Sequence, residues 1–170
     1  MNAFYFLLEK EKKLMNKIYQ DLRIENAKLM PGQYKNFGGR ASKYNRAGAR
    51  NFNVIIDNAE VADELRAQGW NVKIRQPRDE GDLPTFFLGV NVSFGNTYYK
   101  DPRVMRITRS TKLELDENNI SILDDDDILS ADLVIRPHNY TDDNGNNKVK
   151  GYLKEGYFSV SESFADKYVD

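Results

Sequence analysis

The sequence predicts a mainly β protein with one clear helix. Short segments in which apolar and polar residues alternate recur along the chain, as they do in half-buried strands. Glycine, asparagine and proline separate these segments. Residues 58–69 differ, because their apolar residues have helical spacing and a capping residue precedes them. With 170 residues, 40% of them apolar, the chain is long enough for one domain with a packed core.

Eight segments are predicted as strands. The clearest is 51–57, in which Phe52, Val54 and Ile56 alternate onto one face, and the strongest is 86–94. Short strands separated by Gly/Asn turns favour a closed or semi-closed barrel of the OB type with elaborations, and a β-sandwich is the alternative. The predicted strands are, in order, 22–29, 51–57, 70–75, 86–94, 103–108, 111–115, 131–136 and 149–160.

The connections also carry signals. Residues 33–50 are polar, contain three glycines and lack apolar periodicity, which predicts a loop or a distorted hairpin. In the helix, Asn58 is the expected cap, and Gly69 supplies the left-handed residue that ends it. Three later segments are predicted as a turn or short helix, a turn-rich connection, and a last helical turn capped by Ser161: residues 120–130, 138–147 and 161–168.

The first residues are expected to lie outside the domain. The apolar run at 3–8 is far too short to span a membrane, and lysines follow it rather than precede it, unlike in a secretory signal. Codons for residues 9–11 can contain a ribosome-binding sequence shortly before Met15. We therefore expect an N-terminal extension at 1–14, absent if Met15 is the native start, and a single domain at 15–170.

Composition excludes several kinds of site. The chain has no cysteine, which removes disulfides, thiolate metal sites and cysteine nucleophiles, and its one histidine is His138. It contains no phosphate-binding P-loop, no hydrolase nucleophile motif and no zinc-protease motif. We therefore expect no cofactor and no enzymatic activity.

Charge is distributed unevenly along the chain. The formal net charge is −1, but residues 1–78 carry a net charge of +7 and residues 79–170 a net charge of −8. No acidic residue occurs from 26 to 56. Such asymmetry favours a polyanionic partner. The alternative is that the two parts face and neutralise each other in the fold.

Cations and aromatic residues interleave in two segments, 34–52 and 94–112. Cations can follow the phosphates of a single-stranded nucleic acid, while flat rings stack on its bases. Any one of these rings can instead belong to the core. Arg106 is three residues from Arg103 and cannot share its strand face, so a structural role is expected for Arg106 or its neighbours. The predicted nucleic-acid-binding residues are Tyr34, Lys35, Phe37, Arg40, Lys43, Tyr44, Arg46, Arg50, Arg75, Tyr98, Tyr99 and Arg103.

The run Asp124–Asp127 is a competing site. A metal-dependent nuclease could hold a divalent ion with such carboxylates. Four adjacent aspartates cannot all converge on one ion, however, and their spacing matches no ion-binding loop. A solvated turn is therefore the favoured interpretation, and no metal is predicted.

The chain also resembles a known family, over most of residues 22–168. The resemblance includes the runs NFGG at 36–39, GWNVK at 69–73, DLVIRP at 132–137 and GYLK at 151–154. These runs are similar to those of small phage and prophage proteins that bind single-stranded DNA (ssDNA). The resemblance implies an OB-like fold.

The resemblance also implies a function. It points to a protein that coats ssDNA, with RNA as the alternative partner, during phage replication or recombination in the cytoplasm of the infected bacterial host. Copies of this chain and replication or recombination proteins are further candidate partners, and no membrane is expected. The C-terminus lacks the long acidic tail of bacterial ssDNA-binding proteins, which weakens the case for recruiting partners there. A phage protein-interaction module is a third alternative.

Overall fold

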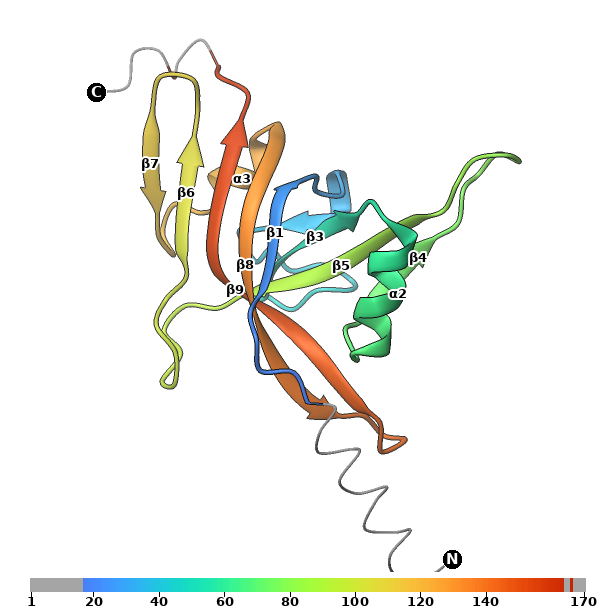
Figure 1. Cartoon of the computed structure of the whole chain (residues 1–170). Coiled ribbons are helices and arrows are strands. Elements are labelled where there is room, and N and C mark those ends of the chain that lie inside the picture. The colour runs from blue at the N-terminus through green and yellow to red at the C-terminus, as the bar shows by residue number, and fades with distance from the viewer. Residues whose placement is uncertain (1–16, 164–165, 167–170) are drawn as a thin grey trace, which may run out of the picture.

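The computed structural model describes residues 17–163 and residue 166, and it has the mainly β architecture that the sequence predicts (Figure 1). In this part of the chain nine strands form one sheet, with a single helix longer than one turn. The helical segments are the 3-10 turn η1 (Gly32–Tyr34), α2 (Ala59–Ala67) and α3 (Ile122–Asp125). The strands are β1 (Leu22–Ala27), β2 (Lys35–Asn36), β3 (Arg50–Ile56), β4 (Val72–Arg75), β5 (Thr85–Val92), β6 (Arg103–Ile107), β7 (Lys112–Leu115), β8 (Ile128–Thr141) and β9 (Asn147–Val160).

The sheet has an OB-like topology. Its main path is β1-β8-β9-β5-β3-β2, in which β5 and β9 run parallel, and β4, β6 and β7 are attached beside this path. The ladder is not closed, but the chain just after β1 turns toward β3, where Leu29 bridges Val54 and Met30 N donates to Asn53 O (2.9 Å). The segment that begins as β1 therefore contacts β8 with its first part and β3 with its last part. The order β1-β8-β9-β5-β3, returning to β1, is the strand order of a five-stranded OB barrel.

Alternation along β3 and β5 builds the core. Phe52, Val54 and Ile56 point inward from β3, as predicted, and all three are buried. Phe52 stacks on Phe37 (ring centroids 5.0 Å apart), and Phe158 of β9 packs edge-on against both rings. The opposite face of β3 and β5 carries Asn51, Asn53 and Asn91, followed by Ile55 and Phe87.

Helix α2 forms for the reasons visible in the sequence. Asn58 Oδ1 accepts hydrogen bonds from Glu60 N (2.8 Å) and Val61 N, which satisfies free N–H groups of the first turn. Gly69, with a φ of +101°, follows the helix and turns the chain toward β4.

The prediction of a turn-rich segment at 138–147 is wrong. Strand β8 continues to Thr141, β9 begins at Asn147, and the turn occupies only residues 142–146. Asp142 Oδ1 accepts from Asn144 N and Asn146 N and so forms this turn. The segment is polar because the end of the β8–β9 hairpin projects beyond the rest of the sheet (Figure 1).

The other predicted connections have mixed outcomes. Residues 33–50 form the distorted hairpin that was one of the two predictions for this segment: β2 pairs with the start of β3, and a short bridge joins Ser42 to Asn45 in the loop between them. Helix α3 is the short helix expected within 120–130. The predicted extension at 1–14 and half of the last predicted helical turn at 161–168 lie outside the described residues. No helix in the described part of the chain is long and apolar enough to cross a membrane.

Candidate nucleic-acid interface

A polar groove crosses the outer face of the barrel. Along part of β3 and β5 the residues that face away from the core are small or polar, because the register places Asn51 directly opposite Asn91 and Asn53 opposite Gly89, before Ile55 and Phe87 continue the same face. These four residues form the floor of a groove with a volume of about 450 Å³. OB folds bind nucleic acids across this face, between the loop after the first strand and the last hairpin.

The walls of the groove carry positive charge. Arg46 reaches it from the loop at 37–49, Lys73 from β4 and Lys150 from β9. Tyr140 and Tyr152 line it from the β8–β9 hairpin. None of the residues that line the groove is acidic. Among the described residues, ion pairs involve other cations only, so these three positive charges are not neutralised by a salt bridge there.

Hydrogen bonds hold the loop at 37–49 against the groove. Asp124 accepts from Phe37 N (2.6 Å) and Gly38 N (2.8 Å), which anchors the start of the loop. Asn45 Nδ2 donates to three backbone carbonyls within the loop, including Arg46 O (3.0 Å). At its tip, Lys43 and Tyr44 lie between the bridged residues Ser42 and Asn45.

Glycine is required where the loop folds back on itself. Gly39 has a φ of +66°, and a Cβ there would lie 2.9 Å from the carbonyl carbon of Gly48. The close approach brings the two ends of the loop together, which leaves its tip exposed: the Tyr44 side chain is 90% exposed. An exposed ring beside lysine is able to stack on a base.

One end of the interface is an aromatic and basic platform. Tyr34 packs edge-on against Phe87 (5.4 Å between centroids), and the Arg75 guanidinium lies 5.9 Å from the Tyr34 ring. Lys73 is the strand partner of Phe87. The platform adjoins the groove floor, because Asn53 Nδ2 donates to Tyr34 O (2.8 Å).

The other end lies on the β8–β9 hairpin. The Arg136 guanidinium stacks 3.8 Å from the centre of the Tyr99 ring, and Arg136 is the strand partner of Tyr152. Lys150 Nζ lies 4.8 Å from the centre of the Tyr140 ring. Rings and cations thus follow each other from one end of the groove to the other.

One of the predicted site residues, Arg46, lines the groove, and Arg40, Lys43 and Tyr44 are exposed on the same loop. Tyr99 contacts Arg136 at the hairpin end of the interface, and Tyr98, its neighbour in the sequence, is 89% exposed. Tyr34 and Arg75 belong to the platform described above.

Four other predicted site residues contribute to neither the groove nor the platform. The prediction that Phe37 stacks on a base is wrong, because its ring is fully buried against Phe52 and Phe158. Arg50 lies over the Phe94 ring and donates from Nη2 to Glu117 O (3.2 Å). Lys35 Nζ donates to Asp126 O (2.7 Å), and Arg103 lies on β6 as the strand partner of Glu155.

The acidic run is structural, and the expectation of a merely solvated turn is wrong. Besides the role of Asp124, Asp126 binds the buried Arg106 through two hydrogen bonds (2.7 and 2.8 Å), and Asp127 accepts from Ser161 Oγ. These carboxylates serve different partners. In the described residues no group of three or more acidic or histidine side chains is arranged to hold a metal ion.

The structural role expected for Arg106 is confirmed. Asp126 and Asp166 flank its guanidinium, and the hydrogen bond to Asp126 raises the pKa of Arg106 well above its ordinary value despite burial. The hydrogen bond from Arg106 lowers the pKa of Asp166 to about 2.

Sequence reasoning missed the groove floor and two of its walls. Six of the missed residues share one signal, because they occupy outward positions of segments predicted as strands. They are Asn51, Asn53, Lys73, Asn91, Lys150 and Tyr152, whereas Tyr140 lies in the segment predicted as turn-rich.

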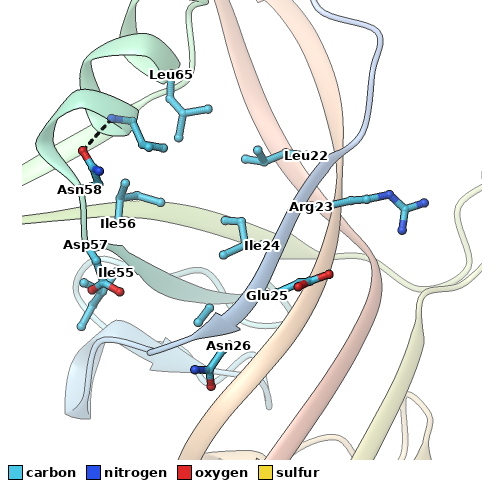
Figure 2. A pocket seen from close by; sticks show the side chains of 12 residues that line it. Leu22, Arg23, Ile24, Glu25, Asn26, Ile55, Ile56, Asp57, Asn58 and Leu65 are labelled. Carbon is cyan, nitrogen blue, oxygen red and sulfur yellow. Dashed lines mark hydrogen bonds between the residues drawn. The ribbon is translucent and has the colours of Figure 1, made fainter.

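A second hollow differs in character. Figure 2 shows a pocket of about 280 Å³ between β1 and α2, into which Leu22, Ile24, Ile56 and Leu65 point. It shares no residue with the groove and is mainly apolar.

No curated protein matches this chain. The single-stranded DNA-binding protein of bacteriophage Enc34, solved in complex with ssDNA, is 11% identical with a TM-score of 0.49, and the match covers 86% of this chain and 94% of that one. The single-stranded DNA-binding protein gp2.5 of bacteriophage T7 is 12% identical with a TM-score of 0.43, over 90% of this chain and 96% of that one.

A family model decides the classification. The model described as "Putative phage ssDNA-binding domain" matches residues 11–170. The match spans nearly the whole chain and agrees with the resemblance noted in the sequence. The chain therefore belongs to the phage ssDNA-binding domain family.

Proposed function

We propose that this protein binds ssDNA in the groove over β3 and β5 and coats it, without catalysis, during phage replication or recombination inside the infected host. Membership in the ssDNA-binding family supports the partner. The observation that carries the proposal is the groove itself, which has three cations and two tyrosines on its walls and no acidic residue.

Phosphates and bases would use different parts of the groove. Lys73, Lys150 and Arg46 are exposed and free of ion pairs with described residues, so they can each take a phosphate and release its counterions. Tyr152 and Tyr140 are half-buried and offer ring surface to bases. Stacking on rings of this kind contributes about 1–3 kcal/mol per base.

This arrangement favours single strands over duplex. Bases that are already stacked and paired cannot lie flat on the tyrosine rings, whereas those of a single strand can. A catalytic role finds no support in the acidic run, because Asp124 and Asp126 are engaged by backbone N–H groups and by Arg106.

The test is a fluorescence anisotropy titration with labelled oligo-dT and with a duplex of equal length. We expect binding of oligo-dT at low salt, much weaker binding of duplex, and a logarithm of the oligo-dT affinity that falls linearly with the logarithm of the salt concentration. Failure to bind oligo-dT at low salt would contradict the proposal. Magnesium-dependent degradation of the oligonucleotide would favour a nuclease instead.

A matched pair of variants tests the groove. Tyr152→Ala should weaken oligo-dT binding through the loss of a stacking surface. Tyr19→Ala is the control, because Tyr19 is 77% exposed and does not line the groove. Equal affinities for the two variants would count against this groove as the binding site.

A further inference from the structure

Three asparagines form the groove floor, and their side chains have a common arrangement. Asn51 and Asn91 face each other across β3 and β5, and Asn53 is two residues along the same face of β3. All three are half-buried and line the groove.

The amide nitrogen of each side chain is held by an acceptor of the protein. Asn53 Nδ2 donates to Tyr34 O (2.8 Å), and Asn91 Nδ2 donates to Gly151 O (3.2 Å). Asn51 Nδ2 donates to Asn45 Oδ1 (3.0 Å). Backbone carbonyls only accept hydrogen bonds, so for Asn53 and Asn91 the nitrogen must be the atom that faces them.

The orientation of Asn51 is fixed indirectly. Asn45 Nδ2 donates to backbone carbonyls of the loop, so its Oδ1 is the atom left to face Asn51. Asn51 must therefore present its nitrogen to Asn45, and all three oxygens are left free to accept.

These oxygens are open to the groove. Among the described residues no donor reaches Oδ1 of any of the three. Within the same residues, Arg50 Nε is the only buried side-chain polar atom without a hydrogen-bond partner, so the three oxygens are accessible to solvent. The floor is thus a row of hydrogen-bond acceptors.

Glycine keeps this row accessible. Gly89 is opposite Asn53, and a Cβ at Gly89 would lie 3.4 Å from Asn53 Oδ1. Any side chain at position 89 would therefore cover this oxygen, whereas glycine lets a planar group approach it.

We propose that the groove floor is a base-edge site that accepts hydrogen bonds from exocyclic amino groups. Cytosine and adenine present such an amino group, whereas thymine and uracil present a carbonyl oxygen at the same position. When an asparagine oxygen faces a carbonyl oxygen of the base, neither oxygen finds a hydrogen-bond donor and the two repel each other. The groove therefore discriminates among bases, in favour of those that carry an amino group; this inference rests on the proposed binding of ssDNA there.

The test compares oligo-dC with oligo-dU of equal length at pH 8 and constant salt. The two pyrimidines have rings of the same size and neither carries the methyl group of thymine, so the comparison isolates the hydrogen-bonding edge. We expect oligo-dC to bind more tightly by roughly two- to tenfold, the effect of one net hydrogen bond. Equal affinities, or tighter binding of oligo-dU, would overturn the inference and leave the proposed function standing. Absence of binding to both would overturn the proposed function itself.

Variants connect the preference to these side chains. Asn91→Ala and Asn53→Ala should bring the ratio of the two affinities toward one, mainly by weakening oligo-dC. Asn118→Ala, at an exposed position outside the groove, should keep the wild-type ratio. Thermal melting identifies any variant that fails to fold. The ratio of oligo-dC to oligo-dU affinity in the wild type tests the inference even if a variant fails to fold. A wild-type ratio in folded Asn91→Ala and Asn53→Ala would contradict the role of the floor.

Discussion

Replacing Asp124 by alanine tests whether the acidic run is a structural anchor. The carboxylate of Asp124 accepts from Phe37 N (2.6 Å) and Gly38 N (2.8 Å), and these bonds join α3 to the start of the loop at 37–49. Hydrogen bonds to a charged group contribute roughly 1.5–3 kcal/mol each when buried. Asp124 is half-buried, which reduces this contribution, so we expect a loss of about 2–3 kcal/mol in the free energy of unfolding.

The assay is urea unfolding and thermal melting of Asp124→Ala beside Asp125→Ala. A loss of this size lowers the melting temperature by roughly 5–10 °C in a domain of this length. Asp125 is the exposed neighbour, and its replacement should leave stability unchanged. Oligo-dT affinity should also fall in Asp124→Ala, because the loop that carries Arg46 and Tyr44 loses its anchor. Wild-type stability of Asp124→Ala, or equal destabilisation by both substitutions, would refute this reasoning.

Three further predictions concern single residues. Gly89→Ala places a methyl group against Asn53 Oδ1 and should weaken oligo-dC binding several-fold in titrations, with melting close to that of the wild type; unchanged affinity for oligo-dC would count against the floor as a contact surface. Tyr44→Ala removes a 90% exposed ring and should weaken binding by about 1–3 kcal/mol per stacked base without changing the unfolding midpoint; an unfolding shift with normal affinity would contradict this. The pKa of Asp166 is about 2 instead of 3.8, so its ionised form stabilises the fold above pH 3.8 and this contribution disappears as the pH falls through about 2. The stability difference between wild type and Asp166→Asn should therefore shrink from pH 4 to pH 2, and a constant difference would contradict the pairing with Arg106.

The strands and the helix could be predicted because their signals are local. Alternation placed Phe52, Val54 and Ile56 in the core, and Asn58 caps α2 as expected. The end of β8 was missed because its residues are polar on a hairpin that projects from the sheet, where alternation of apolar residues no longer marks a strand.

The site was harder to predict because long-range contacts decide which residues are free. Phe37 and Tyr44 lie in the same glycine-containing loop, yet Phe37 is buried by Phe158, far along the chain, while Tyr44 is exposed. The groove floor needs the pairing of β3 with β5, which brings Asn51 next to Asn91. Neither asparagine has a local signal beyond its place in an alternating strand.

Whether the basic and acidic parts of the chain neutralise each other can be decided only from the fold. Part of the acidic half anchors the basic half through hydrogen bonds, as in the contacts of the Asp124 carboxylate with Phe37 N and of Asp126 O with Lys35 Nζ. Among the described residues, no salt bridge joins a cation before residue 79 to a carboxylate after it. The groove is kept free of acidic residues nonetheless, so the separation of charge that the sequence suggested persists where the proposed ligand binds.

The salt dependence of oligo-dT affinity tests the central claim most directly, when measured for the wild type and for the Lys73→Ala/Lys150→Ala double variant. Each phosphate contact on a single strand contributes about 0.7 to the slope of log affinity against log salt. Loss of both lysines should therefore reduce the slope by about 1.4, and Lys112→Ala, an exposed cation on β7, should not change it. A double variant with the wild-type slope and affinity would show that ssDNA does not bind in this groove.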